Sequence, residues 1–148
     1  MSKKQSPFKF YPLATNTEPS VSIVEGFIHA GFPSPVDDAY LEPPIDLNKE
    51  LIKHPATTYI VRVTGDSMID EGIEDGDLLV VDKSKMPEKQ SLSVCMYKGE
   101  FALKRIVQVE GGGLLLMSGN PKYKPIVVED SEDLGVFGVV TWVMKKKS

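Results

Sequence analysis

The chain has 148 residues and a mass of 16.3 kDa. This length suits one domain with a real core plus an arm and is too short for two full domains, because domains commonly run to about 100 to 150 residues. Its composition, 41% hydrophobic and 26% charged, is that of a soluble globular protein. A net charge of -4 excludes an overall electrostatic footprint for nucleic acid, so we expect no direct specific DNA binding.

The chain contains no segment that we expect to enter a membrane. No run approaches the roughly 18 apolar residues of a membrane span, and no N-terminal apolar segment resembles a signal peptide. We therefore expect a cytoplasmic protein. The single cysteine, Cys95, rules out an internal disulfide and lies in an apolar run that predicts a buried strand residue. Two histidines and one cysteine far apart predict no metal site, and no glycine-rich nucleotide motif predicts a cofactor.

The first third of the chain predicts an arm and a connector. Residues 1–30 mix polar, proline and scattered apolar residues without a sustained period, which predicts an extended or disordered, flexible arm. Within residues 27–35 an apolar patch is interrupted by two small residues and closed by two prolines. On the residues alone this is a linker with hydrophobic anchors. Residues 31–56 form a connector, in which Asp46 as a cap and Pro55 as a stop predict a short helix.

From residue 57 to residue 148 the pattern is that of β-strands. Apolar and β-branched runs alternate with turns rich in Gly, Asn and Asp, and no helical pattern of 10 to 15 residues lies between them. The runs are 57–63, 78–82, 91–97, 101–109, 114–118 and 134–144. This arrangement argues against a parallel βαβ fold and predicts a compact, mostly antiparallel β domain.

Ser67 is a candidate nucleophile. It follows the first predicted strand and stands next to Asp66 and close to Gly65, whose conformational freedom permits a tight bend. At such a bend the serine hydroxyl is presented while the amides of Ser67 and Asp66 could hold an oxyanion. A serine beside a glycine is more often a turn residue, so this pattern alone decides nothing.

Lys104, 37 positions later, is the candidate general base. A serine needs a base, and a lysine serves only when neutral, which requires burial away from carboxylates at a cost of roughly 4 to 5 kcal/mol. In a strand, Lys104 shares a face with Ala102 and Ile106, whereas Arg105 points away. We also expect the carboxylate of Asp66 to point away from Lys104. The usual strand lysine, by contrast, is a solvated surface residue.

A catalytic triad is the main chemical alternative within the chain. It would need one of the two histidines, His29 or His54. His29 lies in the apolar patch of residues 27–35, and His54 precedes a proline in the connector. Neither position offers a structural mount for a base, so the serine and lysine pair is favoured.

Four motifs, in this order, closely resemble the UmuD branch of the LexA-like self-cleaving serine peptidases. They are GDSMID at 65–70, GDLLVVD at 76–82, GEF at 99–101 followed by Lys104, and DLGVFGVV at 133–140. The similarity runs from about Phe27 to Met144. One departure is Gln90-Ser91, where relatives often have a Gly-Asp pair before the lysine strand, and we interpret it as a changed surface turn.

This resemblance implies a fold, an activity and partners. The fold is the curved antiparallel β-fold of LexA and signal peptidases with an extended N-terminal arm. Ser67 is the nucleophile, Lys104 the general base, and the Ala30–Gly31 bond is cut so that residues 1–30 are removed. The implied partners are a second copy of the chain, a RecA filament on single-stranded DNA that stimulates cleavage, and a UmuC-like Y-family error-prone polymerase. The implied role is accessory subunit in translesion synthesis during the SOS response.

Three rival functions are weighed against this one. A LexA-like transcriptional repressor would carry a DNA-reading headpiece, for which nothing before Gly31 is long or periodic enough. A signal peptidase would carry a membrane segment. A non-catalytic polymerase-interaction module with an inactive dyad is the third rival, and a cleavage assay at alkaline pH separates it from the peptidase. The apolar final strand, residues 135–144, is the candidate contact of a homodimer.

Overall fold

The structure is a computed structural model that describes residues 8–12, 21–24 and 41–148, except residue 89. It divides into two compact units, which we describe separately: residues 14–53, and residues 1–13 together with 54–148. No helix in these described ranges has the length and apolar character that a membrane crossing requires.

The smaller unit contains a two-stranded sheet and a short helix. Its elements are β2 (Val21–Val24), β3 (Leu41–Ile45) and α1 (Leu47–Leu51), with β2 and β3 antiparallel. The carboxylate of Asp46 accepts hydrogen bonds from the first amides of α1, at 3.0 Å from Asn48 N. The predicted helix and its cap are therefore confirmed, because a side-chain acceptor at this position satisfies amides that the helix itself leaves unpaired.

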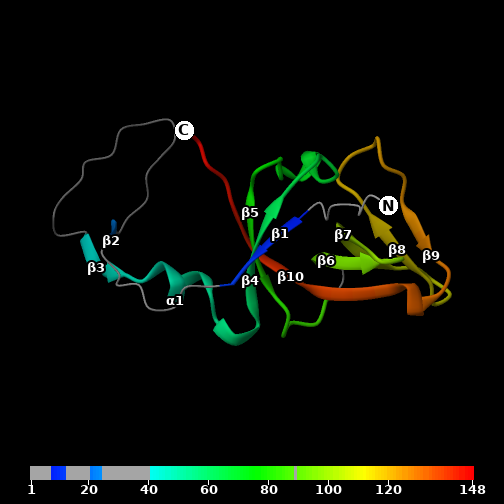
Figure 1. Cartoon of the computed structure of the whole chain (residues 1–148), viewed down its shortest axis with the longest axis horizontal. Helices are drawn as coiled ribbons and strands as arrows, with labels where there is room; N and C mark the ends of the chain where they lie inside the picture. Colours follow the sequence, from blue (N-terminus) through cyan, green and yellow to red (C-terminus); the bar gives the residue numbers. More distant parts are fainter. Residues whose placement is uncertain (1–7, 13–20, 25–40, 89) are drawn as a thin grey trace, which may run out of the picture. The chain divides into compact units, whose positions relative to one another are not determined.

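The larger unit is built on one eight-stranded antiparallel sheet, with the strand order β1-β4-β5-β10-β6-β7-β8-β9 (Figure 1). The strands are β1 (Phe8–Tyr11), β4 (Thr58–Val63), β5 (Leu78–Asp82), β6 (Leu92–Tyr97), β7 (Glu100–Gln108), β8 (Leu114–Met117), β9 (Ile126–Val128) and β10 (Leu134–Met144). Short 3-10 turns occupy Pro55–Thr57, Ile69–Glu71 and Ser131–Asp133. The predicted mostly antiparallel β fold is confirmed.

Strand β10 bends the sheet and lies in its middle. Its register with β6 shifts between Val136 and Gly138, and its register with β5 shifts between Val140 and Trp142. Such irregularities bend a strand and increase its twist. Gly138 is required at the first one, since a Cβ there would come within 2.9 Å of the Asp82 carbonyl oxygen. β6 pairs with the first half of β10, residues 134–139, and β5 pairs with the second half, residues 139–144.

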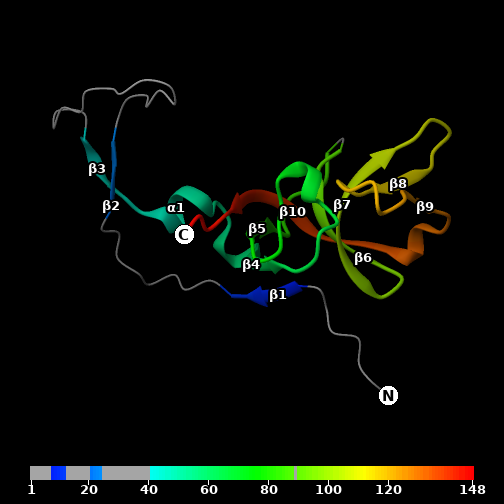
Figure 2. The same cartoon turned by 90° about the horizontal axis from the view of Figure 1, so that it is seen from above.

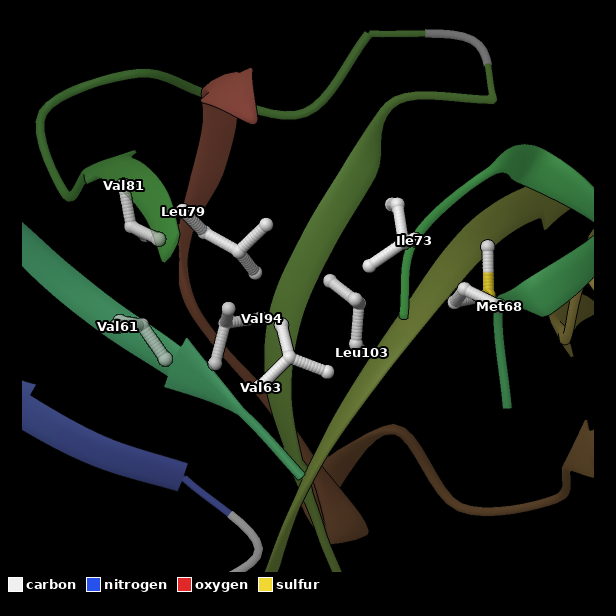
Figure 3. Close-up of a cluster of buried hydrophobic side chains, with 8 residues drawn as sticks. All are labelled: Val61, Val63, Met68, Ile73, Leu79, Val81, Val94 and Leu103. Atoms are coloured by element: carbon white, nitrogen blue, oxygen red, sulfur yellow. The ribbon is translucent and has the colours of Figure 1, made fainter. Parts of the chain in front are cut away.

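Two hydrophobic cores share β6 and β7. The first gathers side chains from the sheet and from the loop after β4, which point toward one another in Figure 3: Val61, Val63, Met68, Ile73, Leu79, Val81, Val94 and Leu103. The second core contains Cys95, Leu116 and Val128. Since successive strand residues face opposite sides, neighbouring residues of β6 and β7 enter different cores. Cys95 is fully buried, as its apolar run predicts.

The segment with the departure from the family pattern, Gln90-Ser91, lies directly before β6. Gln90 is exposed and has a φ of +58°, in the left-handed region that a glycine occupies without strain. Its carbonyl oxygen accepts a hydrogen bond from Arg105 Nη1 at 2.5 Å. Gln90 therefore lies in a surface turn, while the change from relatives stays an interpretation.

Strand β1, in the segment for which the sequence predicts an extended or disordered arm, pairs with β4 at the edge of the sheet (Figures 1 and 2). The register places Phe10 opposite Val61. The Phe10 ring packs against the first core, with its centroid 5.0 Å from that of Phe101 and 4.9 Å from that of Phe137. Tilted ring pairs at these distances are attractive beyond the area they bury. The arm thus contributes a strand and an aromatic anchor to the body.

We predict that Phe10→Ala releases β1 from β4. The substitution removes a half-buried ring and its two aromatic contacts, so the free energy of unfolding should fall by about 1 to 2 kcal/mol. Hydrogen exchange should become faster at the β4 amides that face β1. Tyr11→Ala, which removes an exposed ring of the same strand, is the control. Equal effects of the two variants on β4 exchange would show that Phe10 does not anchor the strand.

Candidate active site

The loop that carries Ser67 begins where β4 ends. Gly65 has a φ of +93°, and its amide donates a hydrogen bond to Asp75 Oδ1 at 2.9 Å. Ser67 is half-buried, while the next residue, Met68, is only 2% exposed and packs into the first core (Figure 3). The tight bend predicted at the glycine is confirmed. Buried Met68 fixes the backbone directly beside the candidate nucleophile.

Lys104 lies in the middle of β7, on the face that belongs to the second core. Ala102 and Ile106 pack on that same core, as strand alternation predicts. Arg105 projects from the other face, where its Nε donates to Glu71 Oε1 at 2.8 Å. Only one of the two adjacent cations is buried, as predicted.

The surroundings of Lys104 favour the neutral form of its amine. The residue is 7% exposed, and burial lowers the pKa of its amine below the ordinary lysine value. The neighbouring Cys95 acts in the opposite direction, although burial raises the pKa of this thiol to about 11. Among the described residues no carboxylate forms an ion pair with Lys104. An amine that is desolvated and unpaired in this way is suited to accept a proton.

The segment from Ser118 to Tyr123, which we call the bridging loop, joins the lysine to the loop of the serine. At its start, Lys104 Nζ donates a hydrogen bond to the hydroxyl of Ser118. One residue later, the amide of Gly119 points at the Met68 sulfur, with 3.0 Å between N and Sδ. Two segments more than 30 residues apart in the sequence therefore meet at consecutive residues of the bridging loop.

Further contacts hold the bridging loop against the backbone around Ser67. The carbonyl of Gly119 accepts a hydrogen bond from the amide of Asp70 at 2.6 Å. Asn120 Nδ2 donates to the carbonyl oxygen of Asp66 at 2.8 Å. A Cβ at position 119 would lie only 3.3 Å from Met68 Cα, so a glycine permits this close approach. Five residues of the loop, with Tyr123 as the last, thus contact either Lys104 or the loop of Ser67.

The carboxylate of Asp66 is engaged by the bridging loop. The hydroxyl of Tyr123 donates to its Oδ1 at 2.6 Å, and Lys122 Nζ lies 3.7 Å from its Oδ2. The Tyr123 hydrogen bond is the main cause that lowers the pKa of Asp66, with Lys122 adding to it against some burial. The Tyr123 ring centroid lies 5.6 Å from Lys104 Nζ. The carboxylate is therefore bound by Tyr123 and Lys122 instead of Lys104, as predicted.

The two amides proposed for an oxyanion hole differ in their surroundings. The amide of Asp66 interacts with its own carboxylate, where it contributes to the lowered pKa. The amide of Ser67 makes no hydrogen bond to any residue in the described part of the chain. The oxyanion hole stays a prediction, in which Ser67 is the stronger donor and Asp66 the weaker.

The structure describes the predicted dyad residues, Ser67 and Lys104, but not the predicted scissile bond. The bridging loop contacts both Lys104 and the neighbours of Ser67. Within residues 41–148, however, the hydrogen bond of Lys104 Nζ goes to Ser118, and none joins it to Ser67 Oγ. The predicted scissile residues, Ala30 and Gly31, lie outside the described residues. A serine hydroxyl, a desolvated amine and an available amide are together the groups that acyl transfer requires.

His54 belongs to a separate structural cluster. Its Nδ1 lies 2.6 Å from Asp82 Oδ2 and 3.4 Å from Ser84 Oγ. In a triad the serine and the carboxylate contact different ring nitrogens, whereas both contact the same nitrogen here. Asp82 also accepts hydrogen bonds from Thr57 and from the Ser84 hydroxyl, at 3.0 and 2.7 Å. The cluster therefore fastens the turn before β4 to the end of β5 and has no triad geometry.

Ser118 and Tyr123 were not predicted as site residues from the sequence. For Ser118 a signal was present, because β7 and β8 form a hairpin across the glycine turn at 111–113. Its register places Arg105 opposite Met117, so the next rung places Lys104 opposite Ser118. Counting along this hairpin would have found the pair. The contact of Tyr123 with Asp66 depends on tertiary packing across 57 residues and left no such signal.

Comparison with known proteins finds similarity over most of the chain. The model of the family described as Peptidase S24-like matches residues 22–141. The chain is 42% identical to protein SamA of Salmonella typhimurium over 117 residues, 79% of each chain. It is 38% identical to protein ImpA of Escherichia coli over 117 residues, 79% of this chain and 78% of ImpA. It is also 32% identical to LexA repressor 2 of Pseudomonas syringae pv. tomato over 141 residues, 89% of this chain and 66% of that repressor.

The family match covers most of the chain and includes both Ser67 and Lys104. SamA and ImpA are matched over more than two thirds of their own length. The chain therefore belongs to the peptidase S24-like family, as a UmuD-like member.

Proposed function

We propose that this protein is a serine peptidase that cuts its own Ala30–Gly31 bond, with Ser67 as nucleophile and Lys104 as general base. The observation that carries the proposal is the amine of Lys104, which is buried, has a lowered pKa and faces the bridging loop that also holds the loop of Ser67. Membership of a family of serine peptidases supports the same assignment.

The proposed reaction has two steps. Neutral Lys104 takes the proton of the Ser67 hydroxyl while Oγ attacks the carbonyl carbon of Ala30, and the Ser67 amide holds the oxyanion. The tetrahedral intermediate collapses as the Lys104 ammonium gives its proton to the Gly31 nitrogen, which leaves as a free amine. A water molecule, deprotonated by Lys104, then attacks the ester between Ala30 and Ser67. The Lys104 ammonium returns this proton to Ser67 Oγ as the Ala30 carboxylate is released.

The proposed setting is the SOS response to DNA damage. A RecA filament on single-stranded DNA favours the conformer in which the segment around Ala30–Gly31 occupies the site, which is a population shift. The processed body, as a dimer, then serves as the accessory subunit of a UmuC-like Y-family polymerase in translesion synthesis. The support for this setting is the similarity to the UmuD-like proteins SamA and ImpA.

The first prediction concerns the bond. The protein incubated at alkaline pH, or with RecA, single-stranded DNA and a nucleotide, should yield fragments 1–30 and 31–148 by mass spectrometry. Gly31→Arg should block the reaction, because a long charged side chain does not fit beside the nucleophile. Ser67→Ala is the negative control. Fragments that begin anywhere but Gly31 contradict the assignment, and an intact wild-type chain would favour a non-catalytic interaction module.

The second prediction concerns pH. Since only neutral Lys104 can act as the base, the rate of unassisted cleavage should rise with pH. The midpoint should fall below the free-lysine value of about 10.4, because burial lowers the Lys104 pKa. Lys104→Ala should abolish cleavage, and Lys104→Arg should fail too, because a guanidinium keeps its proton. Arg105→Ala, next in the chain, should retain the rise. A rate that is flat between pH 6 and 10 argues for another base.

The third prediction concerns the dimer. We expect the exposed apolar side chains of β10 to contribute to a dimer, and these include Val136, Trp142 and Val143. Trp142 is 46% exposed, and such aromatic anchors dominate many interfaces. Wild-type protein at micromolar concentration should sediment at twice the 16.3 kDa monomer mass, and Trp142→Glu at the monomer mass. Val127→Glu, an exposed apolar position on β9, is the control. A wild-type monomer contradicts the proposal.

A further inference from the structure

The hydroxyl of Ser118 is the group that accepts a hydrogen bond from Lys104 Nζ. The β7–β8 register makes Ser118 the cross-strand neighbour of Lys104 on one side, one rung beyond the last pair of β8. On the other side, the register of β6 and β7 places Ser93 opposite Lys104. The lysine therefore lies between two serines, which leave room for its long side chain within the sheet.

These two serines contact different partners. Ser93 is fully buried, and its hydroxyl points to the carbonyl oxygen of Ser91 at 3.5 Å. The Ser118 hydroxyl accepts the hydrogen bond from Lys104 Nζ. Two residues of the same type thus flank the base, and only one of them holds its nitrogen.

A hydroxyl acceptor has a specific consequence for an amine that acts as a base. A neutral amine has one lone pair and can rotate about the Cε–Nζ bond. An acceptor that takes one Nζ hydrogen fixes this rotation and so fixes the direction of the lone pair. A carboxylate would do the same but would also keep the amine protonated. An uncharged hydroxyl therefore orients the base without removing its basicity.

We propose that Ser118 is a positioning residue, whose hydroxyl fixes the rotation of the Lys104 amine so that its lone pair is available to the Ser67 hydroxyl. This inference rests on the proposed function, because it concerns the same base. It adds a third side chain to the pair, supplied by the bridging loop. The position of the loop against Ser67, held by Asn120 and Tyr123, then sets the direction of the base as well.

The charged and titratable groups around Lys104 determine the sign of the pH effect. They are Cys95 on β6 and, in the bridging loop, Tyr123, whose hydroxyl binds Asp66. Arg105 on the same strand faces Glu71 on the opposite side of the sheet. None of these contacts involves the Ser118 hydroxyl. A lone-pair acceptor stabilises the ammonium form more than the amine, so removing the hydroxyl should lower the Lys104 pKa or leave it unchanged.

The experiment compares unassisted cleavage by the full chain as a function of pH. In Ser118→Ala the plateau rate should fall about tenfold, because the base spends less time in the productive orientation. The midpoint of the profile should stay in place or move to lower pH. Ser118→Thr restores the hydroxyl and should recover most of the rate. Ser93→Ala, the other serine beside Lys104, should match the wild type in both plateau and midpoint.

Two outcomes would overturn the inference. The first is a wild-type plateau rate in Ser118→Ala. The second is a midpoint that moves up toward the free-lysine value, which would mean that water has entered and that Ser118 acts only in packing. If the wild-type chain does not cleave at all, the proposed function fails instead. In that case, NMR titration of the Lys104 Cε resonance in Ser118→Ala still tests the contact. A Lys104 pKa higher than in the wild type contradicts it. So does an unchanged pKa together with an unchanged chemical shift of this resonance.

Discussion

The burial of one lysine amine without a carboxylate partner is the constraint on which the rest of the site depends. Lys104 is 7% exposed, and desolvation lowers its pKa. Asp66, next to Ser67, is bound by Tyr123 and Lys122, and Glu71 pairs with Arg105 on the opposite side of the sheet. A carboxylate paired with the amine would hold it in the charged form, in which it cannot accept a proton.

The fold supplies this environment by placing β7 between two cores. Leu103 enters the first core and Ala102 the second, so Lys104 reaches the second core by strand alternation alone. The register shifts in β10 bend the sheet that contains both cores. The bridging loop then contacts both Lys104 and the loop that carries Ser67, because Gly119 allows it to approach the backbone of Met68. Strand alternation, the register shifts of β10 and the glycine at position 119 are local features, although the residues that they bring together are far apart in the chain.

Most of the sheet could be predicted from the sequence. The strands at 78–82 and 134–144 were predicted to the residue, because long β-branched runs bounded by turn residues leave few alternatives. Strands β1 and β9 were not predicted, since each has only three or four residues and forms through its neighbour in the sheet. The face of Lys104 follows from alternation. The contacts of Asn120 and Tyr123 with Asp66 span more than 50 residues, and no local pattern encodes them.

The central claim is that Lys104 activates Ser67. Covalent labelling of Ser67 tests this claim without requiring cleavage of the Ala30–Gly31 bond. A small fluorophosphonate phosphonylates an activated serine, and mass spectrometry of the digested protein identifies the labelled residue. If Lys104 activates Ser67, a single adduct should form on Ser67, faster as the pH rises, and no adduct should form in Lys104→Ala. An adduct on another serine, or equal labelling of Ser67 in the wild type and in Lys104→Ala, would contradict the account.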